Sequence, residues 1–208
     1  MNSEKLTILV DMDSIVADLQ GSWYAAYNEE YNDNLSMDDI HSWDTHKYVK
    51  PECGKDIYKY FTPEMFSSLK PIRGAQKALK RLVHAGHTVL FLTHSPYGCR
   101  DAKEAWAKEH FPFVTELGCM KSKFLVNSDV FIDDSPANIK LYRQHHPNAN
   151  IFSIAYPYNK EVEGLLDLRL GSWRNPEEAW NGFVEAIEEI SFNRSTTCSL
   201  EELSHITG

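Results

Sequence analysis

Short apolar segments alternate with amphipathic segments along most of the chain. Four segments have the length and the β-branched or aromatic content of buried strands: "LTILV" (6–10), "TVLFL" (88–92), "VFI" (130–132) and "IFSIA" (151–155). Four others have the pattern of amphipathic helices: 74–86, 100–111, 135–147 and 176–190. Strands that are apolar throughout and are separated by helices indicate a parallel sheet covered on both faces. The pattern therefore predicts an α/β fold.

Residues 18–70 interrupt this alternation. The segment is rich in aromatic residues interleaved with acids, and it contains no clear strand. We interpret it as a small, mostly helical cap inserted after the first strand, with Asp18 capping the helix that enters it. Residues 1–17 and 71–192 then form the core domain, a Rossmann-like parallel sheet with helices on both faces. The polar residues 193–208 are predicted to be a loosely held C-terminal tail with a short helix.

Composition excludes several classes of partner. With 208 residues, of which 42% are apolar, the chain can bury one sizeable core. A net charge of -9 leaves no basic stripe for a nucleic acid polymer. The N-terminal apolar run is too short for a signal peptide or a membrane span, so we expect a cytoplasmic protein without a membrane partner. The four cysteines are far apart and have no CxxC, which argues against a disulfide framework or a zinc site.

Polar side chains follow the predicted strands at their carboxyl ends, where open parallel sheets bind ligands. These residues are Asp11, Asp13, Thr93, Asp133 and Asp134, with Lys123 in the loop before the third strand. Carboxylates gathered in this way repel one another by roughly 4 kcal/mol per pair at about 4 Å and an effective dielectric constant of about 20. A hard cation such as Mg²⁺, rather than Zn²⁺, fits a site built from Asp without Cys or His. A hydroxyl donor and a lysine beside it predict phosphoryl transfer.

These motifs, taken in order, resemble those of a known superfamily. "DMDSIVAD" (11–18), "LTHSP" (92–96), Lys123 and "VFIDDSP" (130–136) are similar to the four ordered motifs of the haloacid dehalogenase-like superfamily. More narrowly, the chain resembles the 5'(3')-deoxyribonucleotidases over most of residues 5–185. The stretches that carry this resemblance are "DMDSIVADL", "FSSLKPIRGA", "SDVFIDDSP" and "LGSWRNPEEAW".

The resemblance implies a role for each motif residue. Asp11 would attack phosphorus and form an aspartyl phosphate. Asp13 would protonate the leaving sugar oxygen and then activate water. Thr93 and Lys123 would hold the phosphoryl oxygens. The implied Mg²⁺ site consists of Asp11, the backbone carbonyl of Asp13, Asp133 and Asp134, the last of which would orient a water molecule.

Three positions depart from the family pattern. Ser14 stands where a glycine is usual, and serine is small enough for that place. In "LTHSP" we expect Thr93, directly after the strand, to make the main phosphate contact and Ser95 to assist it. The alternative that the loop is shifted and uses Ser95 or His94 instead stays open. Ser135 stands where some relatives carry arginine, which predicts weaker phosphate or sugar contacts there.

The resemblance also suggests four substrate-binding residues. Trp43 is similar to the tryptophan that lines the base pocket of the family, and Leu19 and Phe66 are further candidates by position. Lys103 resembles a lysine near the phosphate. For each of them the alternative is core packing or a solvated surface charge.

We therefore predict a Mg²⁺-dependent phosphatase of deoxyribonucleoside or ribonucleoside monophosphates. A phosphatase of sugar phosphates or another small phosphomonoester is one alternative, and a catalytically silent nucleotide-binding or interaction protein on the same fold is another. A receiver domain is disfavoured, because the chain is too long and lacks a separate phosphate-accepting Asp after a third strand. The intact Asp13 disfavours a silent protein. A homodimer stays open, since some relatives are dimers.

Overall fold

The computed structural model describes residues 4–206, with side chains up to residue 196. Six strands form one sheet in the order β3-β2-β1-β4-β5-β6, and every neighbouring pair is parallel. The strands are β1 (Thr7–Val10), β2 (Thr88–Thr93), β3 (Glu116–Cys119), β4 (Val130–Ile132), β5 (Asn150–Ala155) and β6 (Leu168–Ser172). The helices are α1 (Leu19–Tyr31), α2 (Pro63–Ser68), α3 (Ala75–His84), α4 (Arg100–His110), α5 (Pro136–His145) and α6 (Pro176–Ile206). The prediction of an α/β fold with a parallel sheet is confirmed.

The four predicted strands correspond to β1, β2, β4 and β5. The strands β3 and β6 were missed by the sequence analysis, and they form the two edges of the sheet. Their sequences, "ELGC" and "LRLGS", contain no Val, Ile or aromatic residue. An edge strand pairs on one side only and needs a weaker apolar pattern, so periodicity alone does not reveal it.

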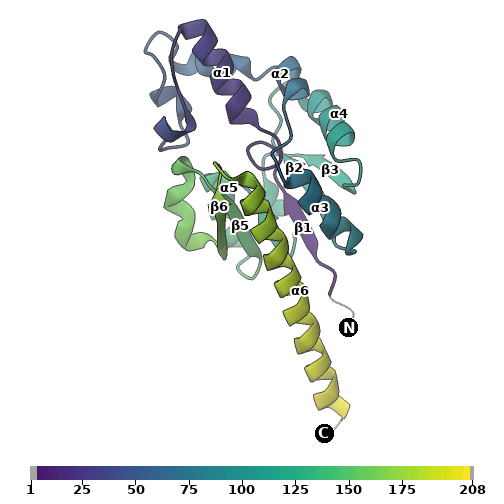
Figure 1. Cartoon of the computed structure of the whole chain (residues 1–208). Coiled ribbons are helices and arrows are strands. Elements are labelled where there is room, and N and C mark those ends of the chain that lie inside the picture. Colours follow the sequence, from purple (N-terminus) through teal and green to yellow (C-terminus); the bar gives the residue numbers. More distant parts are fainter. Residues whose placement is uncertain (1–3, 207–208) are drawn as a thin grey trace.

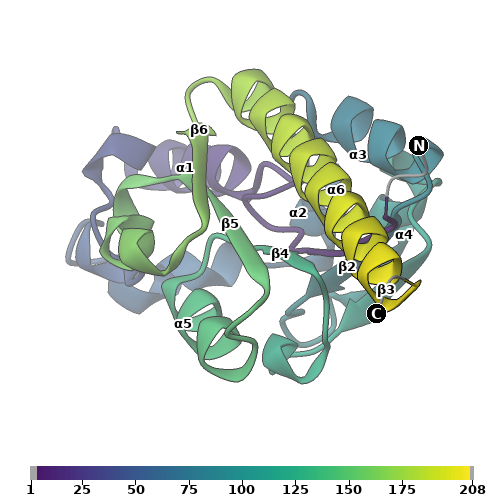
Figure 2. The same ribbon diagram turned by 90° about the horizontal axis from the view of Figure 1, so that it is seen from below.

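The sheet separates two layers of side chains. Ile8 and Val10 of β1 belong to a core cluster that also contains the apolar faces of α3 and α6. Leu9, between them, points to the opposite face, where Phe131 of β4 stacks on Tyr142 of α5 with ring centroids 3.9 Å apart. Figure 2 shows α3 and α6 on one side of the sheet and α5 on the other. Both faces of the sheet are therefore covered by helices, as predicted.

Helix α6 is longer than predicted. It begins at Pro176 and continues to Ile206, so a separate short helix in the polar segment after residue 192 is wrong. Two residues near its middle contact distant parts of the chain: Ser195 Oγ accepts a hydrogen bond from the backbone N–H of Glu4 at 2.6 Å, and Arg194 lies 2.6 Å from Asp129, just before β4. Residues 207–208 of the predicted tail, and residues 1–3 of the predicted core domain, lie outside the described residues. Within residues 4–206, no helix is long and apolar enough to cross a membrane.

Residues 18–70 lie over the carboxyl ends of the strands (Figure 1). They contain α1, α2 and the 3-10 helices Met37–Asp39, Thr45–Lys47 and Gly54–Tyr60. Asp18 Oδ1 accepts a hydrogen bond from Gly21 N at 3.0 Å, so the predicted cap of α1 is confirmed. Both ends of the segment meet, since Asp18 N donates to Lys70 O at 2.9 Å. This placement supports the interpretation of residues 18–70 as a cap.

Candidate active site

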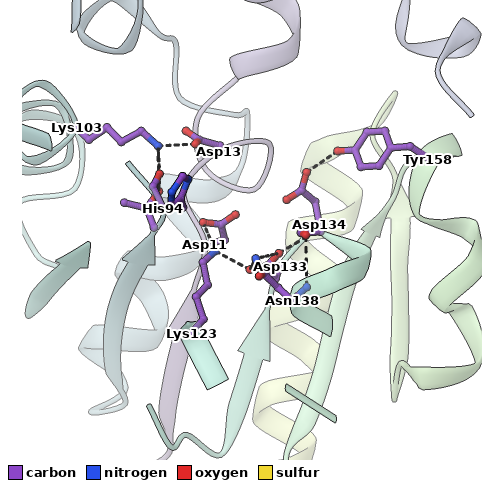
Figure 3. Close-up of polar contacts among 11 residues, drawn as sticks. Asp11, Asp13, His94, Lys103, Lys123, Asp133, Asp134, Asn138 and Tyr158 are labelled. Atoms are coloured by element: carbon purple, nitrogen blue, oxygen red, sulfur yellow. Dashed lines mark hydrogen bonds and ion pairs between the residues drawn. The ribbon is translucent and has the colours of Figure 1, made fainter. Parts of the chain in front are cut away.

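Three carboxylates meet at the carboxyl ends of β1 and β4. Asp11 follows β1, and Asp133 and Asp134 follow β4, which pairs with β1. One carboxylate oxygen of each lies within 4.8 Å of the others, and all three residues are buried. Parallel pairing of adjacent strands brings these residues to one place, although more than a hundred positions separate Asp11 from the other two in the sequence. We call Asp11, Asp133 and Asp134 the carboxylate cluster (Figure 3).

Lys123 is the ammonium group in contact with the carboxylate cluster. It begins the 3-10 helix Lys123–Leu125, and its Nζ lies 2.6 Å from Asp11 Oδ1 and 2.7 Å from Asp133 Oδ2. Burial disfavours the charged form of Lys123, but the carboxylates of Asp11 and Asp133 outweigh this effect and raise its pKa. Lys123 therefore stays protonated in the folded protein and neutralises one of the three negative charges.

Asp133 and Asp134 have further hydrogen-bond donors. Asp133 accepts from Ser135 N at 2.8 Å and from Asn138 Nδ2 at 3.0 Å, whereas Asp134 accepts from Tyr158 OH at 2.6 Å. Burial nevertheless raises the pKa of Asp133 to about 6, and burial together with the neighbouring carboxylates raises the pKa of Asp134 well above its usual value. One ammonium group for three carboxylates leaves a charge of minus two when all are ionised. A divalent cation with oxygen ligands fits this donor set.

The carboxylate of Asp13 is directed away from the cluster. Its Oδ2 lies 2.5 Å from Nζ of Lys103, and its Oδ1 is buried without a hydrogen-bond partner among the described residues. Burial raises the pKa of Asp13, the ammonium of Lys103 acts in the opposite direction, and the charge of Asp11 adds to the rise. The side chain of Asp13 is thus separated from the carboxylate cluster. It is suited to gain and release a proton.

Lys103 is a buried part of the site. Its Nζ donates to Thr93 Oγ1 at 3.1 Å and to His94 O at 2.8 Å, and it lies 4.4 Å from the ring centroid of Phe66. Only 1% of Lys103 is exposed, so the alternative of a solvated surface charge does not hold. Thr93, the last residue of β2, is fully buried beside it. Ser95 is oriented differently, since its Oγ donates to Pro96 O at 3.2 Å.

A cavity of about 270 Å³ adjoins the carboxylates. Its lining includes the polar residues Asp11, Asp13, Ser14, Lys123, Asp134, Ser135 and Asn138, and the apolar or aromatic residues Leu19, Trp23, Tyr24, Trp43, Tyr58, Phe61 and Phe66. Three predicted substrate-binding residues, Leu19, Trp43 and Phe66, therefore line one cavity. Trp43 is 52% exposed, so core packing does not account for its position. Thr93, Ser95 and Lys103 are not among the lining residues, whereas His94 is.

Two residues of the site escaped the sequence analysis. Tyr158 lies just after β5, at the same edge of the sheet as the acids. A search for polar side chains after the carboxyl end of every predicted strand would have found it. Asn138 lies in the first turn of α5, directly after the "DDSP" motif. Ser14 has a φ of 63°, a left-handed backbone that explains why glycine is usual there in the family that the motifs resemble.

Structural comparison gives the class. A haloacid dehalogenase-like family hydrolase from Deinococcus radiodurans R1, solved with bound phosphate and sodium, superposes with a TM-score of 0.55 over 83% of this chain and 93% of its own. The two sequences are 15% identical, so the likeness shows the fold. The parallel sheet of this chain therefore has the haloacid dehalogenase-like fold.

Sequence comparison then gives the family. Residues 5–183 match the family described as "5' nucleotidase, deoxy (Pyrimidine), cytosolic type C protein". The 5'(3')-deoxyribonucleotidase of Clostridium acetobutylicum is 35% identical over 142 residues, which are 67% of this chain and 78% of that protein. The mitochondrial 5'(3')-deoxyribonucleotidase of Mus musculus is 28% identical over 86% of each chain. The chain belongs to this family of nucleotidases, and it is a hydrolase of phosphoric monoester bonds.

Proposed function

We propose that the protein is a Mg²⁺-dependent phosphatase of deoxyribonucleoside and ribonucleoside monophosphates that acts through an aspartyl phosphate on Asp11. One observation carries the proposal. Asp11 lines the cavity, belongs to the carboxylate cluster and contacts the buried ammonium of Lys123. A nucleophile, a cation site and a fixed positive charge therefore border the same cavity. The names of the relatives support the nucleotide as substrate.

The chemistry needs two proton transfers, and we assign both to Asp13. In the first step an oxygen of Asp11 bonds to phosphorus while the bond to the sugar oxygen breaks, and protonated Asp13 gives that oxygen its proton. In the second step ionised Asp13 takes a proton from the water that attacks phosphorus, and the carboxylate of Asp11 is restored. The raised pKa of Asp13 favours the protonated form that the first step requires.

Lys123 is the cationic side chain that borders the cavity, where it would bind the phosphoryl group. Lys123 holds one oxygen of Asp11, which leaves the other oxygen of this carboxylate for attack. Lys103 and Thr93 provide an ammonium and a hydroxyl group beside Asp13. The residues that would hold Mg²⁺ are Asp11, Asp133 and Asp134, with the backbone carbonyl of Asp13. When bound, the ion would offset the negative charge of the phosphoryl oxygens.

The cavity supports a nucleotide over a sugar phosphate. Its lining includes several aromatic rings, which can stack on a planar base. Trp43 contributes from the cap and is half-exposed. A sugar phosphate would leave these rings without a stacking partner. Stacking on an aromatic wall does not select one base over another.

Phosphate release from a panel of 5' and 3' nucleotides and sugar phosphates, with Mg²⁺ and with a chelator, tests the proposal. We expect turnover of nucleotides that is lost with the chelator and in Asp11→Asn. Asp18→Asn is the matched control, because asparagine also caps a helix and Asp18 lies outside the carboxylate cluster. Activity of Asp11→Asn equal to that of the control would refute the nucleophile. Faster turnover of sugar phosphates than of every nucleotide would refute the substrate class.

A cytoplasmic location remains a prediction of the sequence analysis, which left a homodimer open. Cell fractionation and sedimentation analysis, respectively, would test them.

A further inference from the structure

Tyr158 lines the cavity beside Asp134, and its hydroxyl points to the carboxylate of Asp134 (Figure 3). Its hydroxyl donates a hydrogen bond to Asp134 Oδ2 at 2.6 Å, and its ring stacks on that of Tyr156 with centroids 5.0 Å apart and planes 9° from parallel. The hydroxyl of Tyr158 is the donor in this bond. The carboxylate of Asp134 receives no other side-chain hydrogen bond from the described residues.

Two further contacts of Tyr158 come from the cap. Gln20 of α1 donates from Nε2 to the hydroxyl of Tyr158 at 3.4 Å. The ring of Trp43 meets the ring of Tyr158 edge-on, with centroids 5.6 Å apart and planes at 75°. The hydroxyl of Tyr158 therefore contacts both the carboxylate of Asp134 in the core and the amide of Gln20 in the cap. Its ring contacts Trp43 of the cap.

The segment that carries Tyr158 is fixed by its neighbour Asn159. The buried amide of Asn159 donates to Asp134 O at 3.3 Å, to Ser153 Oγ at 3.0 Å and to Ile154 O at 3.0 Å. These bonds fasten the segment after β5 to the strand itself and to the backbone of Asp134. A hydroxyl on such a segment can hold a carboxylate in one orientation, because neither partner is on a mobile loop.

We propose that Tyr158 is a positioning residue that orients Asp134 for the divalent cation and supports Trp43 at the substrate end of the same cavity. The inference rests on the proposed function, since it assumes a cation and a base. Tyr158 belongs to none of the four motifs on which the sequence analysis depended. Loss of a hydrogen-bond partner of a metal-ligating group typically weakens metal binding by 10- to 100-fold.

The test compares Tyr158→Phe with Tyr156→Phe. Both changes remove one buried hydroxyl, but the hydroxyl of Tyr156 donates to the backbone oxygen of Ser14 at 2.6 Å and not to a carboxylate. Isothermal titration calorimetry with Mg²⁺ and no substrate measures the affinity directly. We expect a loss of about 10-fold or more in Tyr158→Phe and a change of less than about 2-fold in Tyr156→Phe. A purely structural role would lower the melting temperature of both variants without separating their Mg²⁺ affinities.

A second measurement addresses the ring. Tyr158→Phe keeps the contact with Trp43, whereas Tyr158→Leu removes it. We expect KM for nucleotides at saturating Mg²⁺ to rise in Tyr158→Leu and to stay near that of the wild type in Tyr158→Phe. KM for p-nitrophenyl phosphate, which has no base, should be the same in both variants.

The outcomes separate the two proposals. Equal Mg²⁺ affinity in the wild type and Tyr158→Phe would overturn the inference and leave the proposed function intact. Absence of Mg²⁺ binding by the wild type would overturn both. Equal KM values for nucleotides in Tyr158→Phe and Tyr158→Leu would overturn the support of Trp43.

Discussion

Burial of the carboxylate cluster makes the stability of the metal-free protein depend on pH. The pKa of Asp133 is raised to about 6 in the folded protein, above its ordinary value of 3.8, so the folded state binds this proton more tightly than the unfolded state does. The stabilising contribution of Asp133 to the free energy of unfolding is therefore fully present below pH 3.8 and is lost as the pH rises through about 6. We predict that the metal-free protein loses stability in this window and that Mg²⁺ restores it.

The magnitude follows from the size of the rise. A change from 3.8 to about 6 corresponds to roughly 3 kcal/mol, at about 1.4 kcal/mol for each pKa unit. Asp133 is completely buried, so solvent does not screen this contribution. Asp13 and Asp134, whose pKa values are also raised by burial, act in the same direction. Mg²⁺ at about 100 times its dissociation constant would add roughly 2.7 kcal/mol to the free energy of unfolding.

Urea unfolding from pH 4 to pH 7, with chelator and with Mg²⁺, measures the effect. Exposed acids such as Glu30, whose pKa is lowered by hydrogen bonds from Lys59 and Tyr60, act in the opposite direction. The informative quantity is therefore the free energy of unfolding with Mg²⁺ minus that with chelator, and we expect this difference to grow as the pH rises. Asp133→Asn should flatten it, whereas the exposed control Asp56→Asn should not. A difference that stays constant from pH 4 to pH 7 would refute the reasoning.

Three further predictions concern single side chains. Lys103→Met should lower kcat/KM by about 10²-fold or more. The basic limb of its pH–rate profile should move to higher pH, because Asp13 loses the ammonium that lowers its pKa. A basic limb at the same pH as in the wild type would contradict this. Trp43→Ala should raise KM for nucleotides by roughly 5- to 150-fold, the equivalent of about 1–3 kcal/mol of stacking, and equal KM values in steady-state assays would remove the stacking role. Ser14→Val should lower the free energy of unfolding by about 2 kcal/mol, because a β-branched side chain is strained at a φ of 63°, and urea titration checks this against Ser14→Gly, which should not lose stability.

The local signals in the sequence were sufficient for the central strands and for the acids that follow them. Asp11 and Asp133 come directly after apolar runs, so their place at the edge of a parallel sheet follows from the position of the strand. The helix stop at Gly86 is also local, since this glycine has a φ of 93° just after α3. Edge strands give no comparable signal, which is why β3 and β6 were not predicted.

Contacts between distant segments were decided by the tertiary structure. The carboxylate of Asp13 is paired with a lysine 90 positions away and is thereby kept out of the carboxylate cluster. Likewise, the hydroxyl of Tyr158 reaches Asp134 across 24 positions, and the ring of Trp43 is brought to Tyr158 by the fold of the cap.

The amino-acid sequence alone determined the α/β class, the order of the chemical motifs and the charge that requires a cation, because each depends on residue type and short-range spacing. The partner of each acid, and hence which carboxylate can bind a cation and which can carry a proton, was decided only when the sheet and the cap were assembled. The physical reason is that a carboxylate's pKa and hydrogen bonds depend on burial and on nearby charges in space, and sequence spacing does not specify either.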